Sequence, residues 1–170
     1  DDVYNATEVA SAVRRLRDLG LCRTASFDAV QRKDGYVITI KINEQPQIGE
    51  VIIDGASAVP SRDLYAVIQS KDNTAVNPKT VQHDIASINA TYQARGFLGC
   101  SVTNVTPPED HGDPLIFDIQ ETRLESIQIT GNSLTKPYVI LRELDTKPGD
   151  VLNTTTLKDD LRRVFNLNYF

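Results

Sequence analysis

The stretch Val51-Ile52-Ile53-Asp54-Gly55 decides the fold of this chain. It returns as Ile127-Gln128-Ile129-Thr130-Gly131, 76 residues later as counted from Gly55 to Gly131. Each copy is a short β-prone run that ends at a turn glycine. The similarity continues beyond the glycine through eight further pairs: Ser57 and Ser133, Leu64 and Ile140, Ile68 and Leu144, Lys71 and Lys147, Asn77 and Asn153, Val81 and Leu157, Asp84 and Asp160, Ile85 and Leu161. Such a period indicates one supersecondary unit that is used more than once.

The N-terminus carries part of another copy, because residues 12–22 align with residues 160–170 at an offset of 148, close to twice the first. The repeat predicts three modules. Residues 1–46 form the C-terminal part of a first module, residues 47–121 a complete second module, and residues 122–170 the strand and two helices that begin a third. We expect the chain to be a fragment of a longer protein whose modules are joined by short linkers of limited flexibility.

The elements follow from the spacing of apolar residues. Val9, Val13, Leu16 and Leu19 form one stripe of a helix that Gly20 ends. Strands at 27–32 and 36–43 flank Lys33-Asp34-Gly35, a strong hairpin signal because Asp-Gly tolerates positive φ.

The second module is predicted to contain a strand at 50–54, a helix from a Ser61 cap to about Gln69, and a longer helix from Pro78 to Gly96. Strands at 100–106 and 115–120 complete it. The predicted fold class is α+β: tandem two-layer β-α-α-β-β modules, each a three-stranded mixed sheet with two helices on one face.

Composition narrows the classes of function. The net charge of −5 argues against a nucleic-acid partner, which normally requires a basic face. No run of about 18 apolar residues predicts a membrane-spanning helix. The first residues lack a basic segment followed by an apolar core, so we expect any targeting signal to have been removed or to lie outside this chain. Cys22 and Cys100 are predicted to be small core residues. Four Asn-x-Ser/Thr sequons start at Asn5, Asn89, Asn104 and Asn153, but bacteria are the simpler origin to assume.

The chain offers no convincing catalytic constellation, and we predict no enzyme, no metal and no cofactor. His83 and Asp84 are sequence neighbours on a helix and point in different directions. Acidic residues and His111 gather in the segment 109–113, but the adjoining Pro108 and Gly112 favour a turn.

The C-terminal copy carries a family resemblance. Residues 127–133 form a strand with a Gly turn, Lys147-Pro148-Gly149 follows the first helix, and the second helix reads Leu161-Arg162-Arg163-Val164-Phe165. This order resembles the POTRA domains of the BamA-type outer-membrane protein assembly family. The second module has the same order of elements, with fewer residues that match.

The resemblance implies a scaffold at the periplasmic face of the bacterial outer membrane, attached to a C-terminal β-barrel of the parent chain. Unfolded outer-membrane proteins and accessory periplasmic proteins or lipoproteins are the implied partners. Strand addition would occur at the edge strand after the second helix, which here comprises Ser101, Val102, Thr103, Asn104, Val105 and Thr106. Two alternatives remain: a POTRA array of a two-partner secretion or organelle import transporter, and a cell-division POTRA protein, which tandem repetition disfavours.

Overall fold

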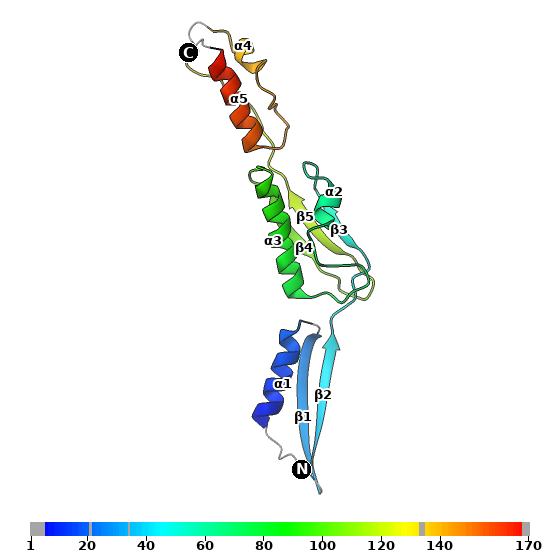
Figure 1. The fold of residues 1–170 in the computed structure, drawn as a ribbon. Coiled ribbons are helices and arrows are strands. Elements are labelled where there is room, and N and C mark those ends of the chain that lie inside the picture. The colour runs from blue at the N-terminus through cyan, green and yellow to red at the C-terminus, as the bar shows by residue number, and fades with distance from the viewer. Residues whose placement is uncertain (1–5, 21, 34, 133–134, 168–170) are drawn as a thin grey trace. The chain divides into compact units, whose positions relative to one another are not determined.

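The computed structural model describes residues 6–20, 22–33, 35–132 and 135–167. Asn5, Asp34 of the predicted hairpin turn, Ser133 and the residues after 167 lie outside this range. The elements, labelled in Figure 1, are α1 (Ala6–Asp18), β1 (Cys22–Arg32), β2 (Gly35–Glu44), β3 (Val51–Asp54), α2 (Ser61–Tyr65), α3 (Pro78–Ala94), β4 (Ser101–Thr106), β5 (Leu115–Gln120), α4 (Pro137–Leu141) and α5 (Thr154–Asn166).

Helix α1 packs on the hairpin of β1 and β2. The two strands are antiparallel, with partners running from Cys22 and Glu44 to Arg32 and Gly35. Val13 of α1 is buried with Cys22 and Ala25, whereas Leu19, the last residue of the predicted stripe, follows the helix and is 57% exposed. The hairpin is confirmed, and β1 begins five residues earlier than the sequence predicted.

Residues 51–120 contain a three-stranded sheet in the order β3-β5-β4. The first strand in sequence therefore pairs with the last, and the predicted α+β class is confirmed. Gly55, which ends β3, has φ +77°, and a Cβ there would lie 2.1 Å from the carbonyl oxygen of Ile119. The glycine that defines the repeat is required because only a residue without a side chain fits against β5.

Two predictions about the helices within residues 51–120 need correction. Helix α2 ends at Tyr65 and not near Gln69, because the backbone N–H groups of the following loop bond to a side chain of α3. Ser61 is the first helical residue and not the cap, since Pro60 holds that position without a side-chain hydrogen bond. Pro78 begins α3 as predicted, in a position where the missing N–H costs nothing.

The chain after β5 contains α4 and α5, but none of its described residues at 127–131 is assigned to a strand. The predicted strand there is not observed. Its counterpart β3 pairs with β5, and residues 127–131 have no such neighbour in the part of the chain that the structure describes. A strand is defined by its ladder, so the sequence pattern alone does not produce one.

The chain separates into two compact units. One contains the chain up to Ile52 with Gln69–Asp84 and Thr106–Ile116, and the other contains Ile53–Ile68, Ile85–Val105 and the chain from Phe117 onward. The largest buried side chains of the first unit include Ile48 and Leu115, and those of the second include Leu64, Tyr92 and Phe117. These units do not follow the predicted module boundaries, so the division at 46 and 121 stays a prediction.

Cys22 and Cys100 are buried free thiols, which confirms their prediction as core residues. Burial raises the pKa of the Cys100 thiol above its ordinary value. None of the described helices has the length and apolar character needed to cross a lipid bilayer.

Candidate functional site

Strand β4 contains the residues that were predicted as a binding edge, Ser101–Thr106. Among the described residues, β5 is its single neighbour in the sheet, so β4 is an edge strand (Figure 1). Ser101, Val102 and Val105 are partly buried, and Thr103, Asn104 and Thr106 are exposed. Backbone groups of alternate residues on an edge strand face away from the sheet, where another extended chain can pair with them.

One outward backbone group of β4 is covered by a side chain. The N–H of Val102 donates to Oδ1 of Asn89, at a distance of 2.9 Å between nitrogen and oxygen. Asn89 lies on α3 and is half-buried. Because the pairing alternates along a strand, Val102 shares its edge with Asn104 and Thr106. An incoming strand that pairs at Val102 has to displace Asn89.

Sequence reasoning missed this role of Asn89. A single asparagine in a helix carries no signal of a contact with a strand that follows 13 residues later in the chain. In the sequence, Asn89 is recognisable only as the start of a sequon. The contact depends on how α3 lies against β4, which is a tertiary property.

The other side of β4 is held to β5 by side chains. Thr103 Oγ1 donates to the carbonyl oxygen of Asp118 at 3.3 Å, and Asn104 Nδ2 donates to Asp118 Oδ2 at 2.8 Å. These contacts supplement the backbone ladder between β4 and β5. The strand ends at Pro107 and Pro108, which lack the N–H groups that continued pairing would need.

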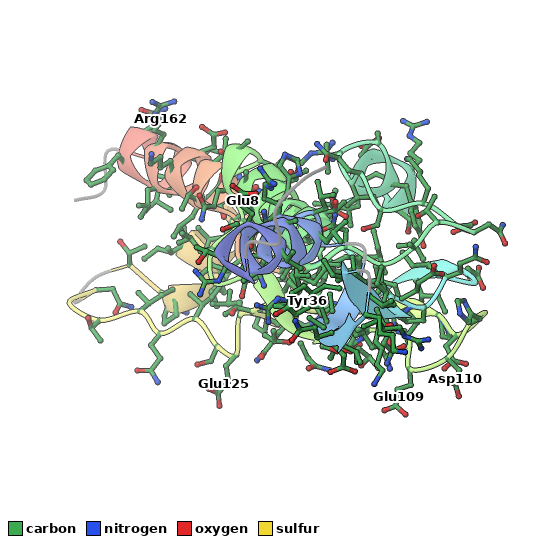
Figure 2. The ribbon with its side chains drawn as sticks, turned by 90° about the horizontal axis from the view of Figure 1, so that it is seen from below. Glu8, Tyr36, Glu109, Asp110, Glu125 and Arg162 are labelled. Carbon is green, nitrogen blue, oxygen red and sulfur yellow. The ribbon has the colours of Figure 1, made fainter. Side chains whose placement is uncertain are left out.

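The acidic segment after β4 is a turn, as predicted. The N–H of Asp110 donates to Asp113 Oδ2 at 2.9 Å, and the N–H of Gln47 donates to His111 Nδ1 at 3.1 Å. The side chains of Glu109 and Asp110 point away from the ribbon in Figure 2. Within the described residues, no group of three or more His, Cys, Asp or Glu side chains is placed to hold a metal ion.

Arg23, at the start of β1, binds the backbone of this turn. Its Nη2 donates to the carbonyl oxygens of Pro108, at 3.2 Å, and Glu109, at 2.7 Å. A charged donor strengthens both contacts. Arg23 thereby fixes the loop into which β4 leads.

A buried carboxylate supports each of the two long helices of the repeat. Asp84 on α3 is 0% exposed, and its two oxygens accept the N–H groups of Gln69 at 2.7 Å and Ser70 at 3.0 Å. Asp160 on α5 is also 0% exposed and accepts from Asp145 at 2.9 Å and Thr146 at 3.0 Å. The repeated pair Asp84 and Asp160 thus holds the loop that follows α2 and α4. Beside Asp84, His83 is 52% exposed, as predicted, but its Nδ1 lies 3.7 Å from Asp84 Oδ1, so the two side chains do not point apart as expected.

The pKa of the Asp160 carboxyl lies below its ordinary value. Burial raises this pKa, but hydrogen bonds from Thr146 and Asp145 and the charge of Arg163 lower it by more than burial raises it. Arg163 also pairs with Asp145 at 2.7 Å. The ionised form of Asp160 is therefore the form that the fold stabilises.

Glu121, directly after β5, has a third buried carboxylate. Its carboxylate accepts the N–H groups of Ser57 and Ala58, each at 2.8 Å, and the hydroxyl of Tyr92 at 2.9 Å. Burial opposes its ionisation, yet the hydrogen bonds from Ser57, Ala58 and Tyr92 bring its pKa below the ordinary value. Burial and the hydrogen bond to Glu121 raise the pKa of Tyr92, which stays protonated and donates.

Comparison with known proteins connects these features to a family. The model of the POTRA family, described as a surface antigen variable number repeat, matches residues 46–122 and 122–170. A putative outer membrane protein assembly factor of Treponema pallidum is 32% identical over 152 residues, which cover 84% of this chain and 18% of that protein. The chloroplastic outer envelope protein 80 of Oryza sativa subsp. japonica is 26% identical over 170 residues, covering 94% of this chain and 25% of that protein.

A solved structure shares the fold. The N-terminal domain of Omp85 from Thermosynechococcus elongatus superimposes with a TM-score of 0.77 at 23% identity, over 98% of this chain and 74% of that one. The chain spans between 18% and 25% of the length of the two curated relatives. Because the family model accounts for most of the sequence in two consecutive matches, the chain belongs to the POTRA family.

Proposed function

We propose that this chain is part of the periplasmic scaffold of an outer-membrane protein assembly machine and that β4 receives unfolded β-barrel clients by strand addition. The observation that carries the proposal is the edge position of β4 in a chain of the POTRA family. The assembly-factor name of the Treponema pallidum relative supports this choice of clients.

Main-chain pairing suits clients of many sequences. Strands of outer-membrane barrels alternate apolar and polar residues but differ widely in side-chain identity. An edge strand supplies affinity through backbone hydrogen bonds, and neighbouring side chains add a mild preference. On β4 the partly buried Val102 and Val105 and the exposed Thr103 and Asn104 offer both kinds of contact. The scaffold acts without catalysis or cofactor.

In the proposed setting, the chain belongs to the periplasmic face of the bacterial outer membrane. The C-terminal β-barrel of the parent chain and accessory periplasmic proteins or lipoproteins are its further partners. An organelle branch of the same superfamily is the second candidate, because the rice chloroplast envelope protein aligns with 94% of this chain. Strand peptides from bacterial and from chloroplast outer-envelope barrels distinguish the two branches by their relative affinities.

The test is an NMR titration of the ¹⁵N-labelled chain with a peptide that copies one strand of a bacterial outer-membrane barrel. Shifts concentrated on 101–106 support the proposal. Two further peptides carry N-methyl groups on alternate residues, in opposite phases. Pairing along one edge uses the N–H groups of one phase only, so one methylated peptide should lose binding and the other should retain it. Equal binding of both methylated peptides would contradict strand addition.

Asn89 provides a matched test on the protein side. Asn89→Ala removes the acceptor that competes for the N–H of Val102. Peptide affinity should then rise roughly two- to tenfold, the equivalent of one ordinary hydrogen bond. Gln93→Ala removes an exposed amide from the same helix and should leave the affinity unchanged. Shifts confined to the helices, or weaker binding by the Asn89 variant, would locate recognition on another surface.

A further inference from the structure

The two repeated asparagines, Asn77 and Asn153, each use both ends of the side-chain amide. Oδ1 of Asn77 accepts the N–H of Lys79 at 3.0 Å, and Oδ1 of Asn153 accepts the N–H of Thr155 at 2.9 Å. Each asparagine directly precedes a long helix, α3 or α5, so this contact is an N-cap. Capping accounts for the hydrogen bond that each Oδ1 accepts, but it gives no role to Nδ2.

The nitrogen of each amide bonds to the end of another helix. Nδ2 of Asn77 donates to the carbonyl oxygen of Leu19, just after α1, at 2.9 Å. Nδ2 of Asn153 donates to the carbonyl oxygen of Arg95, just after α3, also at 2.9 Å. Carbonyl groups at the end of a helix lack intrahelical partners, and a neutral amide can act as acceptor and donor at the same time.

The carboxyl ends of α1 and α3, which accept these two hydrogen bonds, have the same local structure. The N–H of Gly20 bonds to the carbonyl of Arg17 at 2.9 Å, and the N–H of Gly96 bonds to the carbonyl of Gln93 at 3.0 Å. Both glycines have positive φ, +75° and +82°. A Cβ on Gly20 would lie 2.5 Å from Oδ1 of Asn77, and one on Gly96 would lie 3.2 Å from Oδ1 of Asn153.

The geometry points to a docking contact that the repeat itself encodes: we propose that the carboxyl ends of α1 and α3, each followed by a glycine, are binding surfaces for the capping asparagine of the next copy of the repeat. Every member of the contact recurs after 76 residues: Leu19, Gly20 and Asn77 are followed by Arg95, Gly96 and Asn153 in the same roles. Each contact lies within one compact unit, the first in one and the second in the other. The inference does not depend on the proposed client binding.

The asparagine is specified because aspartate cannot make the second contact, and because serine carries its hydroxyl one bond closer to the backbone than Nδ2 of asparagine. Aspartate and serine cap a helix about as well as asparagine, so capping alone leaves the choice open. Aspartate has no donor and would place a carboxylate against the carbonyl of Leu19 or Arg95. The second contact is reinforced by Thr154, whose N–H and Oγ1 donate to the carbonyl of Gly96 at 2.9 and 3.0 Å.

The test uses Asn77→Asp and Asn153→Asp in the full chain, because each variant keeps the cap and removes only the donor. Amide hydrogen exchange should accelerate roughly fivefold at Gly20 in the first variant and at Gly96 in the second, as expected for the loss of one hydrogen bond. Exchange at Lys79 and Thr155 should not change, because the caps remain. Asn77→Ser and Asn153→Ser give the same readout if the carboxylate impairs folding.

Residual dipolar couplings report on the coupling of the helices themselves. In the unmodified chain, amides of α1 and of residues 79–84 should fit one alignment tensor, and Asn77→Asp should require two. Asn132→Asp is the matched control, since Nδ2 of Asn132 donates at 2.9 Å to the carbonyl of Thr135, a residue only three positions later in the chain. The proposal is overturned if Asn77→Asp and Asn153→Asp leave exchange and couplings unchanged, or if the Asn132 control alters them equally.

Discussion

Replacing Asp84 should be one of the most damaging single changes in the chain. The carboxylate is fully buried and is the acceptor for two consecutive backbone N–H groups, those of Gln69 and Ser70. Asp84→Ala leaves both donors without their partner. A hydrogen bond to a charged group contributes about 1.5–3 kcal/mol, so the loss of two predicts a cost of about 3–6 kcal/mol. That is a large part of the roughly 5–15 kcal/mol that stabilises an ordinary domain.

Asp84→Asn refines the estimate, since it preserves the shape of the side chain. One amide oxygen still accepts, but the NH₂ group faces the second N–H, so we expect a cost of about 1.5–3 kcal/mol. Gln82→Ala on the exposed face of the same helix is the control and should change the free energy of unfolding by less than about 0.5 kcal/mol.

The assay is equilibrium urea unfolding followed residue by residue with NMR, because a chain with two compact units need not unfold in one step. The signals of residues 69–92 report the relevant transition. If Asp84→Ala lies within about 1 kcal/mol of the Gln82 control, water has replaced the carboxylate and the assigned role of Asp84 is refuted.

Three further predictions use other parts of the structure. The lowered pKa of Asp160 means that its ionised form stabilises the fold above the ordinary carboxyl pKa of about 4, and that this contribution is lost as the pH falls through the folded pKa. Asp160→Asn should therefore flatten the pH dependence of unfolding on the acidic side. Asn73 has φ +60° where the repeat has Gly149, so Asn73→Ala should cost about 1–2 kcal/mol and Asn73→Gly almost nothing. Tyr92→Phe removes the hydroxyl donor of Glu121 and should cost about 1–3 kcal/mol in urea unfolding.

Each of these predictions has its own control. For Asp160, the exposed Asp159→Asn should preserve the acidic slope, and an equal flattening there would contradict the assignment. For Asn73, equal costs of the alanine and glycine variants would show that backbone strain is not the cause. For Tyr92, the exposed Tyr138→Phe should be neutral, and a neutral Tyr92→Phe would mean that Glu121 is satisfied by Ser57 and Ala58.

The periodic parts of the chain could be predicted because their signals are local. The Asp-Gly hairpin, Pro78 at the first turn of α3 and the strand at 115–120 each depend on neighbours a few residues away. The sequence also shows two corresponding pairs, Asn77 with Asn153 and Asp84 with Asp160. The role of these pairs was not, because a repeat shows that residues are equivalent without showing what they touch.

The errors share one physical origin. Ser61 resembled a cap, but the chain reaches α2 through Pro60, and the expected strand at 127–131 has no ladder partner among the described residues. Helix caps and strands require the right groups to be within hydrogen-bonding distance, and composition does not measure distance.

The sequence by itself determined the repeat, the α+β class and the family, because periodic apolar spacing and turn glycines act over a few residues of chain. Only the tertiary structure decided that Asn89 covers the outward N–H of Val102 and that Asp84 satisfies the loop after α2. Those contacts join groups 13 to 15 residues apart in sequence, and a buried N–H is satisfied by whichever acceptor the fold brings within reach.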